Sequence, residues 1–137
     1  MPTHDQIAFL NEFLATARIA VVAANGESGY PQVTPNWFNW DSERLSISTT
    51  KSRLKYKNFR RDSRATILIY KEPTAADYVL LRGEVKIQDD EIWGATKAIL
   101  DRHMQPDRAD KYIQRMKDAE DRVVLWLKPD RVVRRNV

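Results

Sequence analysis

The chain of 137 residues contains no cysteine, only four glycines and only two histidines, His4 and His103. Without cysteine it can form no disulfide and no thiolate metal site, and it has no cysteine nucleophile. We interpret both histidines as structural or incidental, because one lies near the N-terminus and the other near a predicted helix end. We therefore predict no metal and no catalytic side chain, so any redox chemistry would come from a bound cofactor.

The sequence also lacks the usual nucleophile, nucleotide-binding and targeting motifs. It contains no Gly-x-Ser-x-Gly and no Gly-x-Gly-x-x-Gly pattern. No apolar run approaches the ~20 residues of a membrane-spanning helix, and residues 1–6 do not begin a signal peptide. We therefore predict a single cytoplasmic domain over residues 1–137, without a membrane partner.

The charge balance favours an anionic partner without identifying it. The formal net charge is +4, but lysine and arginine are interleaved with many acidic residues. A basic barrel with exposed aromatic side chains such as Tyr56 and Phe59 could bind single-stranded nucleic acid, an alternative that predicts strongly salt-dependent binding. Because the charge is dispersed, we predict no nucleic-acid partner.

The hydrophobic pattern predicts a β-rich chain with peripheral helices. A helix begins at the capping box of Thr3 and Gln6 and extends to about Ala17. Later helices are expected within residues 48–62, from Asp89 and from Pro106. Strands are expected over residues 18–25, 30–40, 45–49, 64–70, 77–88, 123–127 and 132–133. Six or seven mostly antiparallel strands predict an α+β or mostly β fold, a small Greek-key barrel.

Two of the expected strands carry further information. Gly83, in the middle of the 77–88 strand, indicates a bulge or a close approach by another backbone segment. Both faces of the 123–127 strand are apolar. We therefore predict that this strand is covered on two sides, by the core and by a second protomer.

Hydroxyl and cationic side chains are concentrated in residues 48–62, where an expected strand leads into an expected helix. Hydroxyl groups, exposed amides and the positive end of a short helix would point the same way there, and arginine and lysine add formal charge. Lys55 falls between Leu54 and Phe59 on the side that would face the core, where a lysine needs an anion. The segment therefore predicts a phosphate site.

The alternative for this segment is a helix face exposed to solvent. Arg53, Lys57, Arg60 and Arg61 cluster on one side at about 100° per residue, and Lys55 could extend its stem outward to water. The residues alone leave both interpretations open.

A second candidate is Pro35-Asn36-Trp37 in the expected 30–40 strand. Pro35 removes a backbone donor, so its neighbours can be left with free amides that suit a flat ligand with polar edges. The alternative is an edge strand in which Pro35 prevents aggregation while Trp37 and Trp40 pack in the core or in a dimer contact.

Taken together, these segments resemble the pyridoxamine 5′-phosphate oxidase-like split β-barrel family, and the resemblance covers nearly the whole chain. It rests on the order and spacing of the hairpin, the Pro-Asn-Trp strand, and the segments Ser-Thr-Thr-Lys-Ser-Arg-Leu-Lys-Tyr-Lys-Asn-Phe-Arg-Arg-Asp, Arg-Ala-Thr-Ile-Leu-Ile and Leu-Leu-Arg-Gly-Glu-Val. The short length and the cationic pattern most resemble the branch that binds the deazaflavin coenzyme F420, although FMN-binding members share much of that pattern.

The resemblance implies a homodimeric oxidoreductase that binds F420, or alternatively FMN, at the subunit interface and transfers a hydride to or from an unsaturated small molecule. Arg53 and Lys55 would grip the cofactor phosphate. The implied cofactor-binding residues are Pro35, Asn36, Trp37, Ser48, Thr49, Thr50, Lys51, Arg53, Lys55, Lys57 and Asn58. Lys51, Arg60 and Arg61 would guide the acidic tail that F420 carries and FMN lacks.

The C-terminus departs from the enzymes that oxidise pyridoxamine phosphate. Those enzymes end in an Arg-Leu-x-Pro segment that helps to hold the substrate, whereas residues 130–137 read Asp-Arg-Val-Val-Arg-Arg-Asn-Val. The resemblance therefore does not extend to oxidation of pyridoxamine phosphate. A carrier that binds a flavin or deazaflavin without turnover is the alternative to an enzyme.

Overall fold

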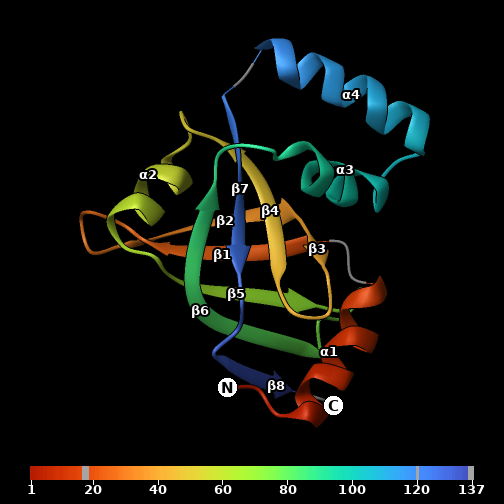
Figure 1. The fold of residues 1–137 in the computed structure, drawn as a ribbon. Helices are drawn as coiled ribbons and strands as arrows, with labels where there is room; N and C mark the ends of the chain where they lie inside the picture. The colour runs from red at the N-terminus through yellow and green to blue at the C-terminus, as the bar shows by residue number, and fades with distance from the viewer. Residues whose placement is uncertain (17–18, 120, 136–137) are drawn as a thin grey trace.

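The computed structural model describes residues 1–16, 19–119 and 121–135, which form a curled antiparallel sheet with helices around it (Figure 1). The helices are α1 (His4–Thr16), α2 (Leu54–Arg61), α3 (Trp93–Asp101) and α4 (Pro106–Ala119). The strands are β1 (Ile19–Asn25), β2 (Pro31–Trp37), β3 (Asn39–Trp40), β4 (Leu45–Thr50), β5 (Arg64–Tyr70), β6 (Tyr78–Gln88), β7 (Arg122–Leu127) and β8 (Arg131–Arg135). The expected helix end at Ala17 and strand start at Arg18 lie outside the described residues.

The strands are ordered β2-β1-β5-β6-β7-β4-β3, and β8 pairs with β6. The long strand β6 connects the two parts of the sheet. Residues 78–84 pair with β5 on one edge, while on the other edge residues 78–82 pair with β8 and residues 85–88 pair with β7. This arrangement curls the sheet into a half-barrel and confirms the predicted split-barrel fold.

The expected 30–40 strand is divided in two at Phe38. The first part, β2, pairs with β1, whereas β3 pairs with β4, so the chain changes partners at a side chain that is fully buried. The described chain therefore has eight strands where the sequence predicted six or seven. The Phe38 side chain itself packs into the main hydrophobic core.

Apolar side chains form two separate buried clusters. The main one fills the curled sheet and includes Leu10 and Leu14 from α1 and Leu81 from β6. The smaller one lies between α3 and α4 and includes Leu100 and Ile113. In Figure 1 these two helices lie together at one end of the sheet, near the ends of β4 and β7. The α3–α4 pair is therefore a separate helical layer with its own small hydrophobic core.

Gly83 confirms the expected close approach of another backbone segment. A Cβ atom at this position would lie 2.8 Å from the Lys128 carbonyl oxygen, in the connection between β7 and β8. The Asp130 amide in the same connection donates a hydrogen bond of 2.8 Å to the Arg82 carbonyl oxygen. A glycine is needed here because the connection runs alongside residues 83–84 of β6 in direct backbone contact.

Strand β7 is covered on both sides, as its two apolar faces predicted. Val123 and Val124, which point to opposite faces, are both 0% exposed within the single chain. The cover therefore comes from the chain itself, and this strand no longer argues for a second protomer. The homodimer stays a prediction.

Within the described ranges, no helix is long and apolar enough to cross a membrane. The predicted cytoplasmic location stays a prediction.

Candidate functional site

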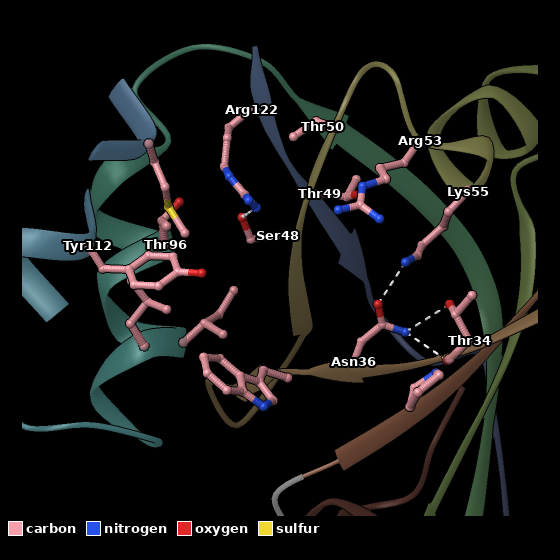
Figure 2. Close-up of a pocket in the computed structure, with 15 residues that line it drawn as sticks. Thr34, Asn36, Ser48, Thr49, Thr50, Arg53, Lys55, Thr96, Tyr112 and Arg122 are labelled. Atoms are coloured by element: carbon pink, nitrogen blue, oxygen red, sulfur yellow. Dashed lines mark hydrogen bonds between the residues drawn. The ribbon is translucent and has the colours of Figure 1, made fainter. Parts of the chain in front are cut away.

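A cavity of about 480 Å³ lies between the sheet and the α3–α4 pair (Figure 2). Its lining comes from β2, β4, the start of α2, α3, α4 and the first residue of β7. The lining residues are Thr34, Pro35, Asn36, Trp37, Ser48, Thr49, Thr50, Arg53, Lys55, Thr96, Ile99, Leu100, Tyr112, Met116 and Arg122. The cavity thus brings together both segments that the sequence singled out, the Pro-Asn-Trp strand and the cationic segment.

Most of the predicted cofactor-binding residues line this cavity. These are Pro35, Asn36, Trp37, Ser48, Thr49, Thr50, Arg53 and Lys55. Three predicted residues lie outside the lining. The Lys51 ammonium is 3.7 Å from the Asp121 carboxylate, the Lys57 side chain is exposed, and the Asn58 amide donates a hydrogen bond of 3.0 Å to Gln32.

The arginines proposed to guide an acidic tail also lie outside the lining. Arg60 donates a hydrogen bond of 3.1 Å to the Tyr56 hydroxyl. Arg61 donates to the Asn58 side chain and to the Asn25 carbonyl oxygen, so it ties α2 to the end of β1. Their proposed role toward an acidic tail stays a prediction.

Lys55 is the central polar group of the cavity. Its side chain is only 9% exposed, and its ammonium donates a hydrogen bond of 2.7 Å to Asn36 Oδ1. The Asn36 amide nitrogen in turn donates to the Thr34 carbonyl oxygen at 2.8 Å and to the Thr34 hydroxyl at 3.1 Å. These hydrogen bonds orient the Asn36 amide, so that the amide oxygen and not the amide nitrogen faces the Lys55 ammonium (Figure 2).

The environment of Lys55 disfavours its charge. Burial lowers the pKa of the Lys55 ammonium from its ordinary value, and the neighbouring Arg53 guanidinium lowers it further. In the described part of the chain, no carboxylate forms an ion pair with Lys55 or Arg53. The hydrogen bond to the neutral Asn36 oxygen offsets part of the free-energy cost of desolvating the Lys55 ammonium, and a bound anion would offset the rest.

The turn between β4 and α2 adds backbone donors. Arg53 is the N-cap residue of α2 in an extended conformation, and its amide donates to the Thr50 carbonyl oxygen at 3.1 Å. A guanidinium cannot accept a hydrogen bond, so no side-chain cap satisfies the first-turn amides. The positive end of the helix dipole therefore coincides with the Arg53 and Lys55 side chains.

Arg122 is a third cation of the lining that sequence reasoning missed. It begins β7 and pairs with Thr50 across the sheet, and its guanidinium donates a hydrogen bond of 3.1 Å to the Ser48 hydroxyl. The residues that line the cavity include no aspartate or glutamate within the described ranges. Arg53 and Lys55 therefore make one end of the cavity positively charged and suited to an anion such as a phosphate ester, while Arg122 adds a charge beside Ser48 (Figure 2).

The opposite side of the cavity has a different character. Sequence reasoning missed its residues, which come mainly from α3 and α4: Thr96, Ile99, Leu100, Tyr112 and Met116. The apolar spacing of the two helices predicted their buried faces, but no local pattern indicated that those faces adjoin the cationic segment. A molecule with a phosphate at one end and a flat apolar ring at the other matches the lining as a whole.

The sequence profile of the pyridoxamine 5′-phosphate oxidase family matches residues 8–135. A search of curated proteins gave no significant match.

Solved structures share the fold over nearly the whole chain. A conserved hypothetical protein of Mycobacterium tuberculosis superposes with a TM-score of 0.82 at 21% identity, covering 99% of this chain and 86% of that chain. A protein described as an F420 reductase gives 0.72 at 24% identity, with 97% and 98% covered. General Stress Protein 26 of Bacillus anthracis gives 0.68 at 12% identity, with 94% and 92% covered.

Proposed function

This chain belongs to the pyridoxamine 5′-phosphate oxidase family, and we propose that it is an oxidoreductase that binds coenzyme F420 in the cavity described above. The family comprises flavin- and F420-binding oxidoreductases. The observation that carries the proposal is Lys55, a residue only 9% exposed whose ammonium faces the cavity beside Arg53 with only a neutral hydrogen-bond partner. A bound phosphate ester would supply the missing negative charge.

The lining residues divide the binding of such a cofactor between them. Arg53 and Lys55 would hold the phosphate, with the Thr49 and Thr50 hydroxyls beside it. The backbone of residues 35–37 would run along the ring system. When bound, the cofactor supplies the hydride, while the chain binds and orients the reactants and excludes water from them.

Two observations support F420 over FMN as the cofactor. The sequence of residues 53–62 resembles the F420-binding branch most, and the structural neighbour described as an F420 reductase matches 97% of this chain. FMN stays the alternative, because the same cations would hold its phosphate.

A homodimer with a cofactor site at each end of the interface is part of the proposal. Val33 and Trp37 project from β2 and are 56% and 42% exposed, which is unusual for large apolar side chains in a strand. Trp37 also lines the cavity, so a second copy seated on this strand would cover the site as well.

The experiment is a titration of cofactor-free protein with F420 and, separately, with FMN, followed by fluorescence. We expect saturable binding of F420 that is tighter than that of FMN. Tighter binding of FMN than of F420, or purification of a yellow protein that already contains flavin, would identify FMN as the cofactor. Failure of both to bind would contradict the proposal.

A second assay distinguishes an enzyme from a carrier. Protein loaded with reduced F420 is mixed with small enones or quinones in single-turnover experiments, and oxidation of the cofactor is followed by absorbance. We expect oxidation with at least one of these acceptors. Tight cofactor binding without any oxidation would favour the carrier instead.

A further inference from the structure

The side of the cavity formed by α3 and α4 carries apolar groups and a single uncommitted hydroxyl. Ile99, Leu100 and Met116 are 2%, 4% and 6% exposed, so the apolar surface that they give to the cavity belongs to a packed wall and not to mobile side chains. The cations Arg53 and Lys55 enter from the other side of the space, beside α2 (Figure 2). The cavity therefore has a cationic end at Arg53 and Lys55 and an apolar side at α3 and α4, and Arg122 lies beside Ser48.

The hydroxyl groups near the apolar side differ in whether they are free to bind a ligand. The Thr96 hydroxyl is fully buried and donates its proton to the Ile92 carbonyl oxygen at 2.8 Å within α3. The Ser48 hydroxyl accepts a hydrogen bond of 3.1 Å from Arg122. The Tyr112 hydroxyl, by contrast, forms no hydrogen bond with any described residue.

The Tyr112 side chain directs its hydroxyl into the cavity. The side chain reaches from α4 across the cavity, and its oxygen faces the Ser48 side (Figure 2). The Arg115 guanidinium lies 5.0 Å from the centre of the phenol ring, and this cation–π contact restricts the ring. A half-buried phenol with an unused donor is suited to bind an oxygen atom of a ligand.

We propose that Tyr112 is a substrate-binding residue, whose hydroxyl donates a hydrogen bond to a carbonyl-type oxygen of an uncharged, apolar substrate packed against Ile99, Leu100 and Met116. This inference rests on the proposed function, because it assigns the cationic end to the cofactor. The substrate is uncharged because a charged group would have to lose its water against the apolar side chains of Ile99, Leu100 and Met116. The tyrosine holds the oxygen so that the substrate carbon next to it faces the cofactor ring.

Menadione is a suitable probe, since it is flat, apolar and uncharged and carries two carbonyl groups. The chain has no cysteine, so this quinone cannot form thiol adducts with it. Binding to protein loaded with oxidised F420, in which no hydride can be transferred, is measured by calorimetry. The infrared carbonyl bands of bound menadione are recorded in the same samples.

We expect Tyr112→Phe to weaken menadione binding about three- to tenfold, the loss of one neutral hydrogen bond. We also expect one carbonyl band, shifted to lower frequency in the wild-type complex, to return toward its free position in this variant. The matched control is Tyr30→Phe, because Tyr30 is 80% exposed and lies outside the lining. The control should bind menadione like the wild type.

Equal menadione affinity and equal carbonyl bands in wild type and Tyr112→Phe would overturn the role of Tyr112. Tighter binding of the anionic menadione sulfonate than of menadione to the loaded protein would overturn the uncharged substrate class. Titration of both variants with F420 in parallel separates these outcomes from failure of the proposed function. If F420 binds normally and menadione does not bind to wild-type protein, only the present inference is wrong.

Discussion

The position of Lys55 lowers the stability of the folded protein but serves the proposed binding of the cofactor phosphate. Its ammonium is desolvated beside another cation, with Asn36 Oδ1 as its hydrogen-bond acceptor. An apolar side chain of similar length would avoid that desolvation. Proteins tolerate such groups where function requires them, because stability above a threshold is sufficient.

The lowered pKa of Lys55 predicts a pH dependence of cofactor binding. A bound phosphate, which is fully ionised above about pH 7, favours the ammonium and draws the Lys55 pKa back toward its ordinary value of 10.5. Binding is therefore coupled to uptake of a proton once the pH exceeds the Lys55 pKa of the unloaded protein. We expect cofactor affinity to fall as pH rises through that pKa, measured by titration at a series of alkaline pH values.

The stability of the unloaded protein should change in the opposite direction. Because the folded-state pKa lies below 10.5, the unfolded chain binds more protons between the two values, so the free energy of unfolding rises with pH in that window. Lys55→Met should remove both dependences. An affinity that is flat with pH in the wild type would argue against a phosphate beside this lysine.

At the scale of single elements, local sequence patterns were sufficient to predict a helix or strand whose bounds depend on its own residues. The capping box at Thr3 and Gln6 forms with reciprocal hydrogen bonds of 2.9 and 3.1 Å, and the 64–70 strand has the predicted bounds. The break at Phe38 was not predictable, because both of its flanks remain extended and only the choice of pairing partner changes. Pairing is a tertiary property.

Glycine substitutions test the close contact between β6 and the β7–β8 connection. Gly83→Ala would bring a Cβ within 2.8 Å of the Lys128 carbonyl oxygen, and we expect it to lower the free energy of unfolding by about 1–3 kcal/mol. Gly94→Ala, on the exposed side of α3 with no atom within 4 Å, should raise it by about 0.5–1 kcal/mol. Urea denaturation of both variants provides the measurement, and a free energy of unfolding that Gly83→Ala leaves unchanged would mean that the two segments are not in close contact.

At the scale of the whole molecule, the sequence revealed one side of the site and not the other. The cationic side lies on one continuous segment, so its strand-to-helix geometry could be inferred from neighbouring residues. Arg122 and Tyr112 reach the cavity only because β7 pairs with β4 and because α3 and α4 pack at the end of that sheet. Such contacts between distant segments leave no periodic signal in a single sequence.

The homodimer is also a prediction at this scale. Val33→Lys would put a charge in the proposed interface on β2, so we expect the variant to be monomeric where the wild type is dimeric. Leu54→Lys is the matched control, because Leu54 is an apolar side chain of α2 with the same exposed fraction, 56%. Light scattering coupled to size-exclusion chromatography measures the masses. A monomeric wild type would contradict the dimer, and dissociation by Leu54→Lys alone would locate the interface on α2.

The most direct test of the account is the cofactor affinity of Lys55→Met, compared with that of Lys128→Met, whose lysine lies at the surface 3.2 Å from Glu43. A charge-assisted contact to phosphate is worth about 1.5–3 kcal/mol, so the account predicts that Lys55→Met binds F420 about ten- to a hundredfold more weakly than the wild type. Lys128→Met should bind like the wild type. Equal affinities of the two variants would contradict the claim that Lys55 is buried in order to hold the cofactor phosphate.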